Sequence, residues 1–236
     1  MKKFVTMAVA MLAVLSLTGS CSKDGSGVTP PDPDPGKEVP DTPGNEDVKP
    51  LTKVPFNKGL NLSDWFNVSD IRYFKADTYT DKDFDNLKSL GIDALRLPLN
   101  FPVFMGGAPE YKFSNSFLTA LDKAVDMALK RDMYIILDQH SYYGSRMFPE
   151  GYGEQLVSAG LRQLAQRYKD RSDHLIIELF NEPGGTYLEA NWPEMQKRLI
   201  AGIRAIDKNR ILIVTGYGCM LSLIHISEPT RQAEIS

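Results

Sequence analysis

Five short apolar runs recur after residue 50, with helical patterns between them, and this repeat limits the folds open to the chain. The runs are Gly59–Leu62, Ala94–Leu97, Tyr134–Leu137, Leu175–Leu179 and Ile211–Val214. The helical patterns, each with an apolar stripe on one face, cover residues 81–90, 117–130, 155–168 and 192–206. A repeated strand–loop–helix unit predicts an α/β fold with a parallel sheet and right-handed crossovers. The repeat length, roughly forty residues, favours an eight-stranded barrel with long loops, although periodicity alone leaves a doubly wound sheet open.

The first helical pattern has clear boundary signals at both ends. Thr80 and Asp83 have the spacing of a capping box at its start. Gly91 follows the last apolar residue and supplies a C-terminal stop. The chain between the first two apolar runs is therefore expected to contain one capped helix.

Composition excludes several classes of protein. Of 236 residues, 42% are hydrophobic and 24% are charged, as in ordinary globular proteins. A net charge of -3 argues against nucleic-acid binding, which usually requires a basic patch. Cys21 and Cys219 lie far apart and indicate neither a disulfide framework nor a metal site. We expect a monomer without cofactor, metal or nucleic-acid partner.

The N-terminus has the layout of a secretory signal. Met1–Lys3 is positive, Phe4–Leu17 is an apolar segment too short for a comfortable membrane span, and small residues precede Cys21. A cysteine in this position resembles a bacterial lipoprotein signal, in which the cysteine is lipidated and becomes the mature N-terminus. We expect residues 1–21 to be such a signal and Cys21 to be the lipidation site. A conventional signal peptide with an incidental cysteine is the alternative.

The segment from residue 22 to residue 50 is predicted to be a disordered spacer. It is rich in Pro, Gly, Asp, Glu and Ser and has almost no large apolar side chain, so it cannot bury enough surface to offset its ordering entropy. Together with a lipidated cysteine, it would hold a domain away from a membrane. The expected location is the outer membrane or cell surface of a Gram-negative bacterium.

The fourth apolar run ends in an amide, a carboxylate and a proline. Pro183 cannot extend a strand, so Asn181 and Glu182 are predicted to lie at a strand's carboxyl end, where parallel sheets build active sites. Glycosidic bonds are cleaved by two carboxyl groups, one of which protonates the leaving oxygen. Glu182 is a candidate proton donor, and Asn181 could hold a sugar hydroxyl. A simple strand-ending turn is the alternative.

Two further polar residues belong to the apolar runs. His140 follows the third run and is expected at the same rim, unless it is an ordinary loop histidine. Arg96 lies inside the second run, where an arginine is costly unless it is paired. Its partner could be Glu178, Glu182 or Asp138. A core ion pair that only orients a carboxylate is the alternative role.

Four motifs in one order identify a family resemblance. They are Lys58–Phe66, Gly91–Pro98, Ile136–His140 and Glu178–Pro183. In this order and spacing they resemble glycoside hydrolase family 5, the cellulase family, from about residue 54 to about residue 218. The resemblance implies a (β/α)8 TIM barrel and retaining hydrolysis of β-linked polysaccharide by an endo-β-1,4-glucanase, with cellulose, mixed-linkage glucan, xyloglucan and mannan left open as substrates.

The resemblance also implies roles for single residues. Glu182 would be the acid/base, Asn181 would contact the sugar 2-hydroxyl, and Arg96 and His140 would belong to the active-site set. Trp65 is assigned to substrate binding, with core packing as the alternative. Loops 101–115 and 141–154, rich in Tyr, Phe and Gly, are expected to shape substrate choice unless their aromatic residues only pack.

The end of the chain departs from the family pattern. The family carries its nucleophile, a glutamate, at the end of strand seven, whereas the fifth run here ends near Thr215. Residues 220–236 resemble a translated sequencing-adapter tail and are expected to be non-native, which excludes Glu228 and Glu234 as nucleophile. Residues 51–219 would then be a partial barrel holding only about the first five strands. Open edges and an unfilled core predict a poorly folded, inactive fragment.

Other functions remain open from the sequence. A carbohydrate-binding lipoprotein with a degenerate, non-catalytic barrel would lack one carboxylate, and a strand-seven glutamate would exclude it. An endo-β-mannanase would share the same motifs. A barrel lyase or aldolase would require a lysine or metal ligands at strand ends, and none occurs on these five runs.

Overall fold

The computed structural model describes residues 54–141, 152–218 and 224–227. The predicted signal, its Cys21 and the spacer 22–50 lie outside the described residues, as does most of the segment 220–236. Within the described part, no helix is long and apolar enough to cross a membrane.

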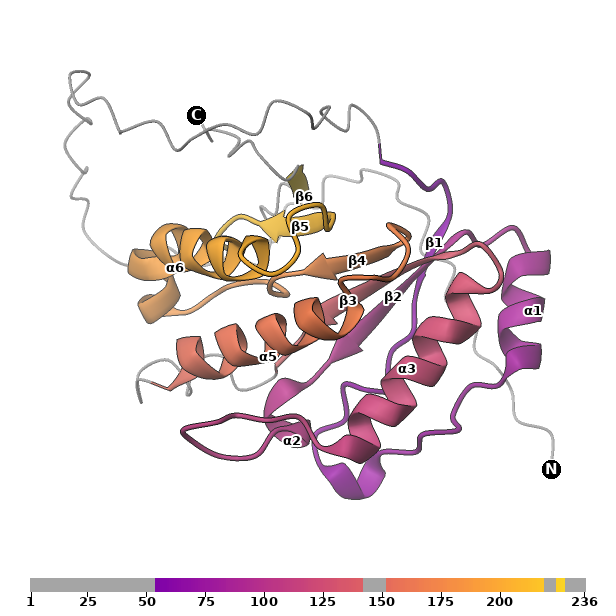
Figure 1. Ribbon diagram of the computed structural model, residues 1–236, viewed down its shortest axis with the longest axis horizontal. Coiled ribbons are helices and arrows are strands. Elements are labelled where there is room, and N and C mark those ends of the chain that lie inside the picture. The colour runs from indigo at the N-terminus through magenta and orange to yellow at the C-terminus, as the bar shows by residue number, and fades with distance from the viewer. Residues whose placement is uncertain (1–53, 142–151, 219–223, 228–236) are drawn as a thin grey trace, which may run out of the picture. The chain divides into compact units, whose positions relative to one another are not determined.

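The strands form one sheet in which chain order and spatial order are the same (Figure 1). They are β1 (Gly59–Asn61), β2 (Ala94–Leu99), β3 (Tyr134–Gln139), β4 (Leu175–Glu178), β5 (Leu212–Thr215) and β6 (Ile224–Ser227). Strands β1 to β5 are parallel. A doubly wound sheet reverses its strand order, so this uninterrupted succession is that of a barrel wall.

The last strand breaks the pattern. β6 pairs antiparallel with β5, whereas the next strand of a (β/α)8 barrel would be parallel. It falls within residues 220–236, and the non-native origin of that segment stays a prediction.

The helices follow one another around one face of the sheet (Figure 1). They are η1 (Ile71–Tyr73), α1 (Asp81–Ser89), α2 (Phe101–Phe104), α3 (Asn115–Leu129), α5 (Gly153–Tyr168) and α6 (Thr186–Arg204). The predicted capping box is confirmed, because the Thr80 N–H donates to the Asp83 carboxylate at 2.8 Å. Gly91 has a φ of 78° and ends α1 as expected.

Helix α6 begins six residues earlier than its pattern predicts. The proline at position 193 resembles a helix start, yet it lies inside the helix. Leu188 and Trp192 are buried one turn apart, on the stripe that Met195 and Leu199 continue. This packing extends the helix past a residue that removes one of its hydrogen bonds.

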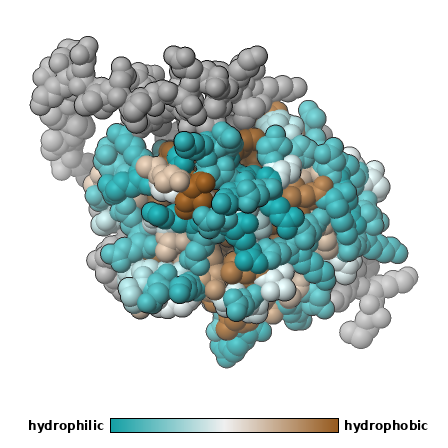
Figure 2. Space-filling model, viewed as in Figure 1, coloured by the Kyte–Doolittle hydropathy of each residue, from teal (hydrophilic) through white to brown (hydrophobic). Residues whose placement is uncertain are grey.

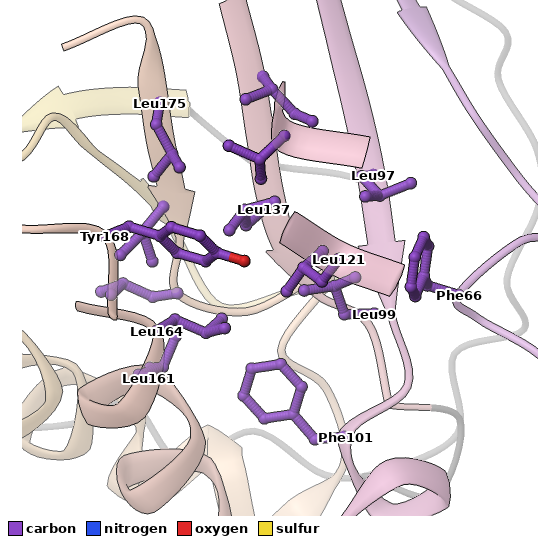
Figure 3. Packing of buried hydrophobic residues seen from close by; sticks show 14 of the residues in the cluster. Phe66, Leu97, Leu99, Phe101, Leu121, Leu137, Leu161, Leu164, Tyr168 and Leu175 are labelled. Atoms are coloured by element: carbon purple, nitrogen blue, oxygen red, sulfur yellow. The ribbon is translucent and has the colours of Figure 1, made fainter. Parts of the chain in front are cut away.

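The main core lies between the sheet and the helices. Figure 3 shows Leu97, Leu99, Leu137 and Leu175 of the strands facing side chains of α3, α5 and the loops. Alternate strand residues point to the opposite face, where Ile136, Ile176 and Ile213 form a smaller cluster. Polar residues follow these isoleucines toward the carboxyl ends of the strands.

The aromatic residues of loop 101–115 pack rather than face solvent. Phe101, Phe104, Tyr111 and Phe113 are all buried. The rings of Phe104 and Phe113 stack on Phe117 with centroid distances of 4.5 and 4.6 Å. The expectation that this loop's rings shape substrate choice is therefore corrected in favour of core packing. In the loop 141–154, residues 142–151 lie outside the described residues.

Large apolar side chains are exposed at scattered positions of the described chain. They are Val54, Ile71, Tyr73, Leu90, Tyr187 and Tyr217. Figure 2 shows one face, on which hydrophilic residues predominate and apolar residues occur in small patches. Such single exposures are normal in soluble proteins and require no special explanation.

Two helix glycines provide a matched test of this packing. A Cβ at Gly160 of α5 would come within 2.5 Å of the buried Phe101 ring, whereas one at Gly202 of α6 would meet only Arg162 side-chain carbons at 3.6 Å. We expect Gly160→Ala to destabilise the domain by about 1–3 kcal/mol through overpacking. Gly202→Ala should be neutral or stabilising by up to about 1 kcal/mol, because alanine favours helix. In the protein expressed with its downstream sequence, urea unfolding followed by tryptophan fluorescence, to which the buried Trp65 and Trp192 contribute, measures both. Equal shifts in the two variants would contradict the packing described for α5.

Candidate active site

Arg96 joins the polar residues at the carboxyl ends of the strands. Its Nε and Nη2 atoms donate to the two carboxylate oxygens of Glu178 at 2.7 and 2.8 Å. Nη2 also lies 2.8 Å from Asp138 Oδ2 and donates to Asn181 Oδ1 at 2.9 Å. Nη1 donates to Asn61 Oδ1 at 3.2 Å. One guanidinium thus connects residues of β1, β3 and β4 with the segment that follows β4.

The strand register explains why these groups meet. Asp138 is paired with Glu178, so two carboxylates lie side by side on adjacent strands. Arg96 is paired with Ile136, two residues before Asp138, and its long side chain reaches the carboxylates diagonally. Two carboxylates this close would repel each other without a cation, so the arginine compensates an otherwise unfavourable pair.

Glu178 and Arg96 both have perturbed pKa values. Burial raises the pKa of Glu178 to about 7, the charge of Asp138 adds to the rise, and Arg96 opposes it. Burial by itself lowers the pKa of Arg96, yet the hydrogen bond to Glu178 and the nearby carboxylate charges together outweigh this and leave that pKa raised. The charge of Glu182 contributes in the same direction, so Glu182 also acts on this cation.

His140 is attached to the same group through Asp138. Its Nδ1 lies 2.7 Å from Asp138 Oδ2, and its main-chain N–H donates to Leu99 O at 2.8 Å. Asp138 is 0% exposed, whereas the His140 side chain is 22% exposed. The imidazole is therefore held from a buried carboxylate and keeps a surface that a ligand could contact.

Asn181 and Glu182 follow β4, as the sequence predicts. The Asn181 N–H donates to Gln139 O at 2.9 Å, which fixes the turn against β3. Glu182 has a φ of 43° and an exposed side chain. The left-handed conformation costs a non-glycine residue of order 1–3 kcal/mol and is typical of functional sites. Pro183, which follows the turn, is buried, and its carbonyl oxygen accepts a hydrogen bond from the Gly218 N–H at 3.0 Å.

Trp65 does not lie with this group. It is 1% exposed, its indole N–H donates to Lys75 O at 3.2 Å, and it packs against Phe66, Tyr79 and Phe84. A ring with no exposed face cannot stack on a sugar. The assignment of Trp65 to substrate binding is therefore corrected to core packing, which was its alternative.

The structure also adds residues to the predicted set. The sequence left the partner of Arg96 open among three carboxylates, and both Glu178 and Asp138 bond to it. Asn61 joins through its amide, although its motif gave no sign of a site role. Alternation along β3 could have identified Asp138, because it lies two residues before His140 on the same face. Within the described residues, no group of three or more metal-ligating side chains is arranged to hold a metal ion.

Comparison with known proteins agrees with this geometry. The family model described as Cellulase (glycosyl hydrolase family 5) matches residues 52–235. Cellulase/esterase CelE of Acetivibrio thermocellus is 27% identical over 209 residues, which are 79% of this chain and 26% of that protein. Endoglucanase C of the same organism is 27% identical over 178 residues, or 69% of this chain and 50% of that protein.

A solved structure confirms the fold class. Thermotoga maritima Cel5A, in a mutant form with cellobiose, superposes with a TM-score of 0.62 and 26% identity, covering 69% of this chain and 55% of that one. The sheet is therefore part of a (β/α)8 barrel, and the chain spans about half the length of Endoglucanase C and Cel5A. From its motifs, its sheet and the family match, the chain belongs to the cellulase family, glycosyl hydrolase family 5.

Proposed function

We propose that this chain is the N-terminal part of a retaining endo-β-1,4-glucanase that hydrolyses plant polysaccharide. Glu182 is the acid/base, and the nucleophilic glutamate lies in sequence beyond Gly218. The observation that supports this most is the Asn181–Glu182 turn at the end of β4, which Arg96 connects to two buried carboxylates. The endoglucanases and cellulases among the relatives support the same reaction.

The described residues can perform one half of that reaction. Glu182 protonates the glycosidic oxygen as the bond breaks, then accepts a proton from the water that releases the glycosyl-enzyme. Its exposed side chain is open to a polysaccharide. Asn181 accepts from Arg96 through Oδ1, so its amide offers N–H donors to the sugar 2-hydroxyl.

Arg96 and His140 complete the binding surface in this proposal. Arg96 neutralises the buried carboxylates beside the reaction centre, and its charge favours a second ionised glutamate close by. His140 donates or accepts a hydrogen bond at a sugar hydroxyl. In a retaining enzyme the nucleophile stands about 5–5.5 Å from the acid, so a strand of the remaining barrel must place it across the cleft from Glu182.

We also propose that the enzyme is tethered to a membrane. Lipidated Cys21 would anchor it at the outer membrane or cell surface, and the spacer 22–50 would carry the barrel toward insoluble substrate. The support is the signal layout and the spacer composition. Labelling with a radioactive or clickable fatty acid should tag the wild type, and Cys21→Ser should abolish the tag. An unlabelled wild type would indicate a conventional signal peptide, and labelling of Cys21→Ser would exclude Cys21 as the lipidation site.

The gene with its downstream sequence tests the activity. We expect a glutamate at the end of strand seven and cleavage inside carboxymethylcellulose, detected as an early fall in viscosity relative to released reducing ends. Faster cleavage of mannan than of glucan would identify an endo-β-mannanase instead. A protein that binds cello-oligosaccharides but hydrolyses none, and that lacks the strand-seven glutamate, would be a non-catalytic carbohydrate-binding lipoprotein.

The 236-residue chain by itself should be poorly folded and release no reducing sugar from carboxymethylcellulose. The reason is that parallel strands β1–β5 supply only part of a barrel's inner layers and do not include strand seven, which carries the nucleophilic glutamate in the family. A reducing-sugar assay against a no-enzyme control checks the activity, and tryptophan emission checks folding. Measurable release by this chain would contradict the proposal that the nucleophile lies elsewhere.

A further inference from the structure

We propose that Asp138 is a positioning residue that sets the protonation and orientation of His140 and connects them to the Asn181–Glu182 turn. The inference rests on the proposed function, because it assigns Asp138 a part in the same reaction. The juxtaposition that carries it is one carboxylate oxygen that pairs with the Arg96 guanidinium and also contacts the His140 ring nitrogen. Asp138 Oδ2 lies 2.8 Å from Arg96 Nη2 and 2.7 Å from His140 Nδ1.

Asp138 is buried more deeply than an ion pair by itself requires. Its side chain is 0% exposed, and its second oxygen, Oδ1, has no hydrogen-bond partner among the described residues. A buried carboxylate that leaves an oxygen unbonded costs stability. The surface ion pair of Asp122 with Arg167 shows the less costly alternative, in which a half-exposed carboxylate uses both oxygens. A costly arrangement at the carboxyl ends of the strands indicates a role in the site.

The shared oxygen determines which nitrogen of His140 carries a proton. An ionised carboxylate only accepts hydrogen bonds, so Nδ1 must be protonated. In the neutral ring Nε2 is then the acceptor, and in the charged ring Nε2 is a donor. Asp138 therefore selects one tautomer and holds the ring plane, while the main-chain bond from His140 to Leu99 O holds the backbone.

The same oxygen also couples His140 to the other half of the site. Arg96 bonds to Asp138 and to Asn181 through one nitrogen, Nη2, so a shift of the Asp138 carboxylate displaces the amide beside Glu182. Among the described residues, Asp138 of β3 contacts the His140 ring, Glu178 of β4 interacts with it electrostatically, and Arg96 of β2 contacts both carboxylates.

Asp138→Asn is the decisive variant, because an asparagine oxygen can replace Oδ2 while its amino group takes the place of the unbonded Oδ1. The variant should fold, yet it loses the charge that holds the imidazole proton. In the protein expressed with its downstream sequence, we expect kcat/KM on cellotetraose to fall about 10- to 100-fold, the effect of losing a charge-assisted hydrogen bond. The pH profile of kcat/KM should also change, because Asp138→Asn removes one negative charge from the site.

Two controls separate positioning from structure. Asp122→Asn also removes a carboxylate that accepts from an arginine, Arg167, and from Tyr168, but on α3 and α5, away from the strand ends. It should leave both kcat/KM and the pH profile unchanged. If Asp138→Asn lowered the unfolding midpoint but left kcat/KM within about threefold and the profile in place, Asp138 would be structural only and the inference wrong.

A measurement without catalysis distinguishes this inference from the proposed function. The ring-nitrogen resonances of His140, assigned by comparison with His140→Gln, should show a protonated Nδ1 in wild type and should shift in Asp138→Asn as that proton is held less firmly. An inactive wild type with this shift present would refute the glucanase proposal and keep the Asp138–His140 coupling. An active wild type without the shift would refute the coupling alone.

Discussion

Glu182→Gln in the protein expressed with its downstream sequence should lower kcat on carboxymethylcellulose by about two to four orders of magnitude, the range for loss of a general acid. The amide is nearly isosteric with the carboxyl, so the turn between Asn181 and Pro183 should persist. Because an unactivated sugar alkoxide leaves only when protonated, the loss should appear mainly in kcat rather than in KM. Initial rates from reducing-sugar release measure it.

The matched control is Glu189→Gln, an exposed glutamate in the first turn of α6. It changes the same functional group seven residues along the chain and should leave the rate within about twofold of wild type, as for other exposed substitutions. A near-wild-type rate for Glu182→Gln on the polysaccharide would remove Glu182 from the acid/base role.

Arg96→Met should produce the largest loss of stability among the site variants. Methionine preserves much of the side-chain volume but leaves Glu178 and Asp138 buried without their cation. Breaking a buried pair by removing one partner costs about 3–5 kcal/mol. Arg72→Met, which removes an exposed pair with Asp70, should leave the unfolding midpoint nearly unchanged, because solvent screens exposed ion pairs.

The pH dependence of the Arg96→Met loss has a definite sign. Burial already raises the pKa of Glu178 to about 7 in the folded state, and removal of Arg96 raises it further. A carboxyl group whose pKa is higher in the folded state than in the unfolded state resists ionisation when the protein is folded. It therefore lowers the stability of the fold at pH values where it is ionised in the folded state. The destabilisation of Arg96→Met should therefore be greatest above the folded pKa and shrink as pH falls toward the unfolded value of about 4.3.

Urea midpoints measured by tryptophan emission at about pH 5 and about pH 8 test this prediction. The difference between Arg96→Met and wild type should be smaller at the lower pH. A loss that is independent of pH, or larger in acid, would show that the arginine contributes through packing and not by compensating the carboxylates.

Periodicity predicted most of the fold, and the reason is physical. Leu95, Leu97 and Leu137 face the helices while Arg96 and Ile136 face the other way, so each strand shows the alternation of a sheet with two environments. The helices were predicted equally well, because each helix has an apolar stripe in its sequence and that stripe is buried in the structure. The parallel order followed from the helical crossovers. The start of α6 was missed because burial of Leu188 and Trp192 outweighs the local cost of Pro193.

The site was predictable where strand ends carry polar residues and less so where contacts are distant in sequence. Arg96, His140, Asn181 and Glu182 were singled out because each interrupts or ends an apolar run. Trp65 was assigned to substrate binding from the family resemblance, yet the packing of Phe66, Tyr79 and Phe84 around it decides its burial. The bond between Arg96 and Asp138 joins residues 42 positions apart, which no local pattern specifies.

The structure defines the contacts and the conformation of the Asn181–Glu182 turn, which follows β4. Asn181 is tied to β3 by its backbone and to Arg96 by its side chain, and Glu182 follows in a left-handed conformation that exposes its carboxylate. In the proposed function, the reaction partner of Glu182 comes from a strand that completes the barrel, so the test uses the protein expressed with its downstream sequence.

The most direct measurement compares wild type and Glu182→Gln on 2,4-dinitrophenyl β-cellobioside, whose leaving group departs without protonation. We expect Glu182→Gln to form the glycosyl-enzyme at nearly the wild-type rate and then to stall, because water lacks its general base. Stopped-flow absorbance should show a burst of one dinitrophenolate per enzyme followed by slow turnover. If the variant lost as much activity on this substrate as on carboxymethylcellulose and showed no burst, Glu182 would not be the acid/base.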